Sequence, residues 1–104
     1  MKLNHRYLCN YQIVNELCLL FLKDNHLLSQ ANNLIIFEVT SKNNLANLAC
    51  NLLFLVKIAN NKEKFLTFLK NSKYAQYFQK VEIINNFLNF YCQQKYLVEI
   101  ISKI

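Results

Sequence analysis

The sequence predicts an all-α fold, a small bundle of about four or five helices forming a single domain over residues 1–104. The chain contains no glycine and no proline, residues that the many tight turns of a β-rich fold normally require. Asparagine occurs 16 times, and it can end helices in place of glycine because it tolerates the left-handed conformation. Apolar residues also recur every three or four positions over long stretches, which is typical of helices.

The first helix is expected at residues 5–23, before Asp24 and Asn25. Its apolar stripe is formed by Tyr7, Tyr11, Val14, Cys18 and Phe21. Residues 26–40 are expected to be an apolar connector or a helical turn. Segment 34–40 is rich in β-branched residues, so a strand is the alternative there. A lone strand would lack a ladder partner in a helical chain, which favours the connector.

A central helix is expected to follow, with Ser41 as its N-cap and its last turn at residue 59. Apolar residues lie nearly all round it, which predicts a position in the core. Asn60 and Glu63 have the spacing of a capping box and predict a short helix over residues 61–70.

Ser72 can cap the last helical stretch, which carries two apolar stripes between residues 77 and 104. Residues 55–70 also align with residues 88–103 at an offset of 33 positions. Helical repeats of this length stack in pairs, so short α-solenoid-like helix pairs are an alternative arrangement.

The chain shows no concentrated catalytic chemistry. The absence of glycine excludes the phosphate-binding loops that need close backbone approach. His5 and Cys9 are one helical turn apart, but the four cysteines lack the close pairing typical of zinc sites. The cysteines are therefore expected to be small core residues rather than metal ligands or a disulfide scaffold. We expect a non-catalytic protein with no cofactor and no metal site.

The net charge of +6 favours acidic partners such as RNA, anionic lipid or acidic protein surfaces. Only one arginine is present, which argues against sequence-specific DNA reading. Aromatic rings near lysines can stack on bases while the lysines hold phosphates. The sequence therefore predicts a basic and aromatic contact surface made of Lys62, Lys64, Lys70, Lys73, Tyr74, Tyr77 and Lys80.

The chain is 54% hydrophobic and 17% charged, more apolar than a small core readily hides. This excess predicts a structural subunit that packs against other protein subunits in a larger assembly. The scarcity of residues with GC-rich codons suggests an AT-rich genome, and an organelle-encoded accessory subunit of a mitochondrial respiratory-type complex fits both features. The alternatives are an RNA-contacting subunit of an organellar ribosome and a small inhibitor from a phage or an AT-rich bacterium, located in the cytoplasm. No segment reads as membrane-spanning, which leaves peripheral membrane association open.

Overall fold

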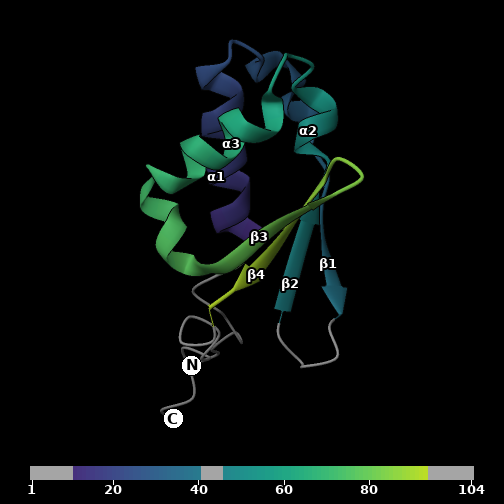
Figure 1. The fold of residues 1–104 in the computed structure, drawn as a ribbon. Coiled ribbons are helices and arrows are strands. Elements are labelled where there is room, and N and C mark those ends of the chain that lie inside the picture. The colour runs from purple at the N-terminus through teal and green to yellow at the C-terminus, as the bar shows by residue number, and fades with distance from the viewer. Residues whose placement is uncertain (1–10, 41–45, 94–104) are drawn as a thin grey trace, which may run out of the picture.

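The computed structural model describes residues 11–40 and 46–93, and it shows a mixed α/β architecture in which helices pack on an antiparallel sheet (Figure 1). The predicted all-α fold is wrong. The helical elements are α1 (Tyr11–Asp24), the 3-10 helix η1 (Leu28–Asn33), α2 (Leu52–Leu55), α3 (Asn61–Lys70) and the 3-10 helix η2 (Lys73–Tyr77). The strands are β1 (Ile36–Thr40), β2 (Ala46–Cys50), β3 (Phe78–Ile84) and β4 (Phe87–Cys92).

The sheet has the strand order β1-β2-β4-β3, and every neighbouring pair is antiparallel. Strands β1 and β2 pair with each other, as do β3 and β4, and β2 joins β4 in the centre. Helices α2 and α3 lie between these two strand pairs in the sequence. This order leaves β1 and β3 at the two edges of the described sheet.

The β3–β4 hairpin replaces the long final helix that the sequence predicted. Its two-residue turn consists of Asn85 and Asn86, with φ values of 51° and 66°. Two consecutive left-handed residues are the requirement of a type I′ hairpin turn, and asparagine meets it without glycine. The absence of glycine therefore did not exclude β-structure, because asparagine adopts the same backbone conformation in this turn.

The predicted central helix from Ser41 to residue 59 is also wrong. The described part of that segment contains strand β2 and the single turn of α2. Strand β2 is the ladder partner of β1, with Glu38 opposite Leu48. The strand alternative for residues 34–40 is thus correct from Ile36 onwards. Its ladder partner, β2, lies in the segment that was predicted to be the central helix.

Two helices were predicted well. The end of α1 at Asp24 lies one residue beyond the predicted end, while the predicted residues 5–10 lie outside the described part of the chain. Helix α3 has the predicted bounds, but Asn60 makes no side-chain cap and instead adopts a left-handed φ of 59°. The Ser72 side chain accepts a hydrogen bond from the Tyr74 amide, so it does cap the next element, the 3-10 helix η2.

The proposed 33-residue repeat has no structural counterpart in the residues that can be compared. Residues 88–92 form strand β4, whereas residues 55–60 form the end of α2 and a loop. Residues 94–103 lie outside the described part. The α-solenoid alternative is therefore wrong as well.

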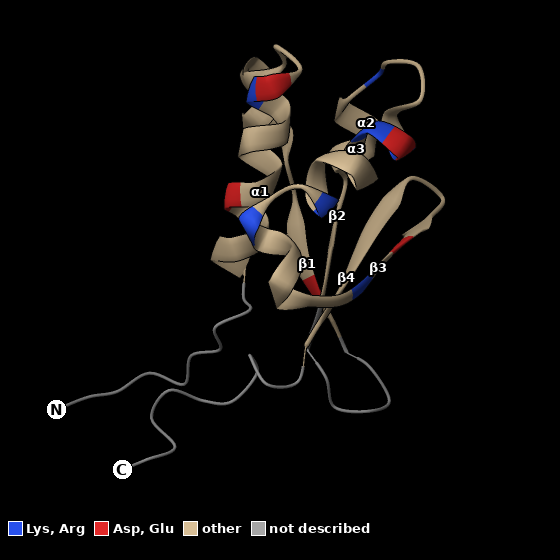
Figure 2. Ribbon diagram, turned by 60° about the vertical axis from the view of Figure 1, so that its left-hand side comes forward, with Lys and Arg blue, Asp and Glu red and all other residues tan. Residues whose placement is uncertain are grey.

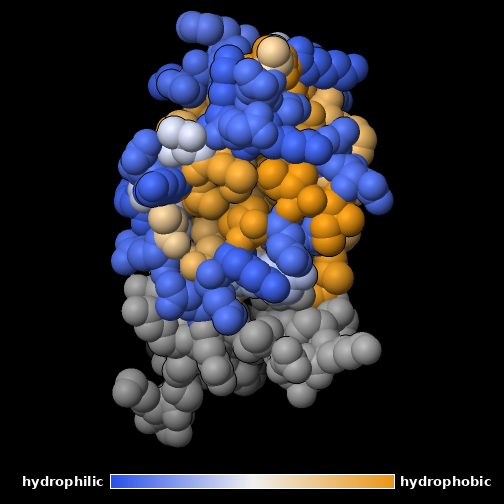
Figure 3. Space-filling view, viewed as in Figure 1, coloured by the Kyte–Doolittle hydropathy of each residue, from blue (hydrophilic) through white to orange (hydrophobic). Residues whose placement is uncertain are grey.

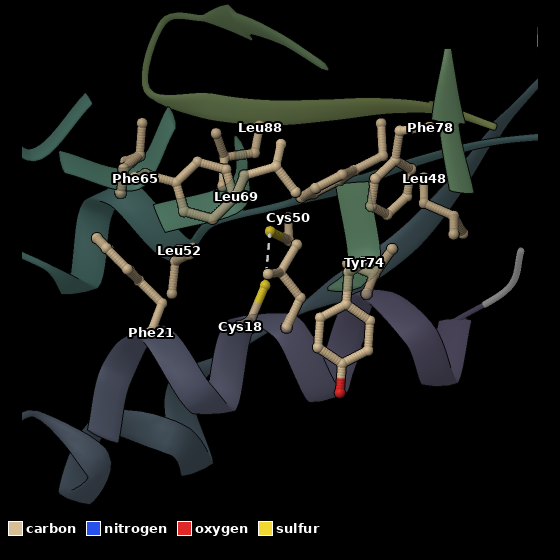
Figure 4. Packing of buried hydrophobic residues seen from close by; sticks show 14 of the residues in the cluster. Cys18, Phe21, Leu48, Cys50, Leu52, Phe65, Leu69, Tyr74, Phe78 and Leu88 are labelled. Atoms are coloured by element: carbon tan, nitrogen blue, oxygen red, sulfur yellow. Dashed lines mark hydrogen bonds between the residues drawn. The ribbon is translucent and has the colours of Figure 1, made fainter. Parts of the chain in front are cut away.

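The core lies between α1 and one face of the sheet, with α3 closing it (Figure 4). One side of α1 is fully buried, including Leu17 and Phe21. The ring of Phe21 packs edge-to-face on Phe65 of α3, with centroids 5.2 Å apart. From the sheet, Leu88 and Phe90 of β4 point into the same cluster. We term this side of the sheet the inner face.

Candidate functional site

The opposite side of the sheet, the outer face, carries apolar side chains that no described element covers completely. Pairing across the sheet places Phe37 of β1 beside Ala49 of β2. Val39 lies two residues along β1 and so shares the outer face. At the other hairpin, Ile84 pairs with Phe87. We define the outer apolar patch as these residues together with the adjoining ring of α2, that is, Phe37, Val39, Ala49, Phe54, Ile84 and Phe87. All of them are exposed except Ala49, which is buried beneath its neighbours.

Phe87 is the centre of an aromatic cluster in this patch. Its ring centroid lies 5.0 Å from that of Phe54 and 6.2 Å from that of Phe37, both edge-to-face. All three rings remain at least 37% exposed. A shallow groove of about 300 Å³ runs beside them and is lined by Phe37, Val39, Ala49, Ile84, Asn85, Phe87 and Asn89. Clustered exposed aromatic rings of this kind mark binding surfaces more often than isolated apolar residues do.

Apolar surface is also broad on the side of the molecule shown in Figure 3, where it crosses the middle over α3 and the strands. Hydrophilic residues of the upper helices border it. On α3, the exposed apolar residue is Leu66. The excess of apolar residues noted in the sequence is therefore visible as exposed surface.

Strand β1 has one backbone edge, next to the patch, that pairs with no described strand. The Asn51 amide donates to the Ile35 carbonyl at 3.3 Å, and the Ile35 amide donates to Asn51 Oδ1 at 2.8 Å. The backbone of Ile35 is thus directed towards β2, and direction alternates along an antiparallel strand. The amides and carbonyls of Ile36 and Glu38 therefore point to the side where no described strand pairs.

Charged side chains are scarce on the sheet, as Figure 2 shows. Within the described strands they are Glu38, Lys80 and Glu82. Lys80 lies 3.6 Å from Glu82 and sits 4.6 Å from the ring centre of Tyr91. A hydrogen bond to Glu82 raises the pKa of Tyr91, with burial as a smaller cause. Glu38, in contrast, is exposed and forms no ion pair with any described residue.

The seven residues predicted as a basic and aromatic surface lie on α3, η2 and β3: Lys62, Lys64, Lys70, Lys73, Tyr74, Tyr77 and Lys80. The lysines are exposed. Tyr74 is only 5% exposed, and its hydroxyl donates to Glu16 Oε1 at 3.1 Å. Burial raises the pKa of Tyr74, and the hydrogen bond to Glu16 raises it further. The Tyr74 ring is therefore part of the core, and RNA contact by the lysines stays a prediction.

The cysteines occupy different environments. Cys18 and Cys50 are free, fully buried and adjacent, with 3.7 Å between their sulfur atoms. Cys92 is also buried but takes part in a disulfide bond, which the cysteine spacing did not predict. Within residues 11–40 and 46–93, no three His, Cys, Asp or Glu side chains gather as metal ligands. The pair His5 and Cys9 lies outside those residues.

Sequence reasoning missed the outer apolar patch. The helical interpretation placed Phe54 on a central helix and Phe87 on an apolar stripe of the last helical stretch, and it gave Phe37 no role. A signal was present in the Asn85-Asn86 pair, which has β-branched residues before it and aromatic residues after it, the usual pattern of a two-residue hairpin.

None of the helices in the described part of the chain is long and apolar enough to cross a membrane. The described residues instead place an apolar patch beside an unpaired strand edge. The chain matches no protein-family model, no curated protein and no solved structure, so the patch is identified by its geometry alone.

Proposed function

We propose that the protein is a non-catalytic interaction subunit that binds another protein through β1 and the outer apolar patch. In this proposal an extended segment of the partner pairs with the open edge of β1 as a fifth strand. The carrying observation is that the amides and carbonyls of Ile36 and Glu38, which pair with no described strand, lie on the same strand as the exposed ring of Phe37, and this ring is 6.2 Å from that of Phe87. Strand addition uses such main-chain groups for affinity and neighbouring side-chain pockets for specificity.

The charge distribution supports a protein partner over a nucleic acid at this surface. The outer apolar patch itself contains no charged residue. The exposed lysines Lys62, Lys64 and Lys70 lie on α3, and Lys80, which shares the outer face, lies 3.6 Å from Glu82. Nucleic-acid binding depends on neutralising phosphates with Lys and Arg, which the patch does not offer.

Glu38 defines the chemistry of the partner strand. Like charges directly opposite each other destabilise a strand pair, and opposite charges stabilise it. A second copy of β1 paired symmetrically about Glu38 would place two carboxylates face to face. A partner strand with a basic residue opposite Glu38 and apolar residues opposite Phe37 and Val39 satisfies all three positions. We therefore expect a foreign strand with an apolar–basic–apolar pattern.

The residue usage of the chain supports a place for this subunit in an organelle-encoded, mitochondrial respiratory-type assembly. Asparagine, lysine, isoleucine and phenylalanine are abundant and glycine, proline and tryptophan are absent, as in an AT-rich genome. Isolation of the native complex and identification of its subunits by mass spectrometry tests this part of the proposal. Recovery of the chain without companion proteins would contradict it.

The strand-addition proposal is tested with two synthetic peptides, Thr-Val-Lys-Val-Thr and Thr-Val-Glu-Val-Thr, titrated into the labelled full chain and followed by amide NMR shifts. We expect the lysine peptide to bind more tightly, with the largest shifts in β1. The variant Glu38→Lys should reverse this preference, because the attractive and repulsive pairs exchange places.

A matched pair of variants separates the patch from general surface apolarity. Phe37→Lys should abolish peptide binding, whereas Leu66→Lys on α3 should preserve it, although the two side chains are 43% and 42% exposed. Equal binding of both peptides, or equal loss in both variants, would refute the proposal. Sedimentation showing a dimer that Phe37→Lys dissolves would identify a second copy as the occupant and would refute the foreign partner.

A further inference from the structure

A second feature of the molecule, independent of the outer apolar patch, is the pair of thiols inside the core. Cys18 projects from α1 and Cys50 from the end of β2, and the two side chains point towards each other (Figure 4). They are 32 positions apart in the sequence, both are 0% exposed, and their sulfur atoms lie 3.7 Å apart. No other pair of free thiols occurs among the described residues.

The two sulfur atoms are in contact, and a short movement would bring them to bonding distance. A disulfide bond joins sulfur atoms at about 2.05 Å, so the two atoms must approach by less than the width of one atom. Rotation about the bond between the α and β carbons moves a cysteine sulfur atom by such a distance. The surrounding core holds α1 against the sheet, which keeps the two thiols opposed.

We propose that Cys18 and Cys50 are an oxidative modification site that closes into a disulfide between α1 and β2. The shared hydrogen bond lowers the pKa of Cys50 and raises that of Cys18, so Cys50 ionises first. The thiolate is the reactive form of cysteine. Cys92 already takes part in a disulfide bond, whereas Cys18 and Cys50 are both free thiols.

With hydrogen peroxide as the oxidant, the reaction proceeds in two steps. The Cys50 thiolate attacks one peroxide oxygen and the O–O bond breaks, which gives a sulfenic acid and a hydroxide that takes up the thiol proton as water. The Cys18 sulfur atom then attacks the Cys50 sulfur atom, the S–O bond breaks, and the leaving hydroxide departs as water with the Cys18 proton. Two thiols are oxidised by two electrons in total, and one peroxide is reduced to two waters.

The bond would close a loop that contains all of η1 and β1. Such a closure restricts the unfolded chain and makes unfolding less favourable. The buried position also has a kinetic consequence. Because neither thiol is exposed, peroxide must wait for a local opening of α1 from the sheet, and low concentrations of urea should accelerate the reaction.

The test uses the full chain with Cys18 and Cys50 reduced, treated with hydrogen peroxide both in the folded state and during refolding. We expect a mass loss of about 2 Da, from the two thiol hydrogens that oxidation removes. Tryptic peptides 7–23 and 43–57 should then be found joined. Peptide 7–23 also contains Cys9, so fragment ions between positions 9 and 18 assign the bond. The oxidised protein should unfold at a urea concentration higher by about 1–2 M than the protein with Cys18 and Cys50 reduced.

The matched controls are Cys18→Ala and Cys50→Ala, each checked for cooperative unfolding before use. In both variants the joined peptides should disappear and the urea midpoint should stop responding to peroxide. If either variant fails to fold, the fragment ions of the wild-type chain still decide the outcome. The proposal is overturned if Cys18 and Cys50 are not joined in either arm, or if each is oxidised separately to a sulfinic acid.

Discussion

The two faces of the sheet are built from the same four strands, but the inner face is buried and the outer face keeps aromatic rings exposed. On β4, Leu88 and Phe90 face inwards and are fully buried, while Phe87 faces outwards and is 37% exposed. Helix α1 covers the inner face, whereas the outer face meets Phe54 of the single-turn helix α2 and keeps its aromatic rings at least 37% exposed. Antiparallel sheets usually combine one apolar face with one polar face. Here the outer face is apolar only in part, because the register places Lys80 and Glu82 of β3 on it, whereas Phe37 and Phe87 stay exposed on the same face. A cluster of exposed aromatic rings of this kind favours a binding role.

The strongest test of this comparison replaces one phenylalanine on each face of the same strand. Phe90→Ala should lower the free energy of unfolding by about 3–5 kcal/mol, because it leaves a cavity in the closed core. Phe87→Ala should lower it by about 1 kcal/mol or less, because the ring is already in contact with water. Urea unfolding followed by circular dichroism measures both. Equal losses would mean that the outer face is as important to folding as the inner one.

A smaller effect is expected at Asn51, which lies between β2 and α2 and holds the residues just before β1. Its side chain accepts from the Ile35 amide at 2.8 Å and donates to the Asn33 carbonyl at 2.9 Å. Asn51→Ala should cost about 1–2 kcal/mol and speed amide exchange in β1 more than in β4, because only β1 loses its anchor. Asn32→Ala, at an exposed position on η1, is the control. Uniform acceleration across the sheet would show that Asn51 acts globally.

The smallest expected effect is that of Tyr74, at the edge of the inner core, on the pH dependence of stability. The pKa of the Tyr74 hydroxyl is raised in the folded state, so the unfolded chain loses this proton at a lower pH than the folded chain does. The stability that Tyr74 contributes is therefore complete below about pH 10 and falls as the pH rises further. Tyr74→Phe should cost about 1 kcal/mol at pH 7, for the lost hydrogen bond to Glu16, and should flatten the decline above pH 10.

Urea titrations between pH 7 and pH 11 measure this slope. The variant Tyr11→Phe is the control, because the Tyr11 ring is exposed on α1 and its substitution should leave stability at pH 7 unchanged. A slope that persists in Tyr74→Phe would assign the alkaline loss to other groups.

The helices that the sequence predicted correctly are those whose local signals agree with their surroundings. The spacing of Val14, Cys18 and Phe21 matches one buried side of α1, and the bounds of α3 follow from its local residues. The apolar stripe predicted for the first helix did not identify every buried residue, since Tyr11 belongs to the stripe but is exposed. The candidate site was not predictable in this way, because Phe37, Phe54 and Phe87 come from three separate elements.

The hairpins show why periodicity failed over the other half of the chain. Leu48 and Leu52 are four residues apart, as on one side of a helix, yet the structure places the first on a strand and the second on α2. In a chain this apolar, spacings of two, three and four residues all occur by chance. The choice between strand and helix then depends on the pairing available to the backbone, which short-range spacing does not encode.

By itself the sequence determined the C-terminal end of α1 to within one residue, the bounds of α3 and the excess of apolar residues. The tertiary structure decided that β1 has a partner, that Asn85 and Asn86 turn a hairpin, and which apolar residues remain outside. The physical reason is that a strand is stabilised by hydrogen bonds to residues distant in the sequence, whereas a helix satisfies its backbone locally. The outer apolar patch likewise depended on the tertiary structure, because its aromatic rings meet only after the strands have paired.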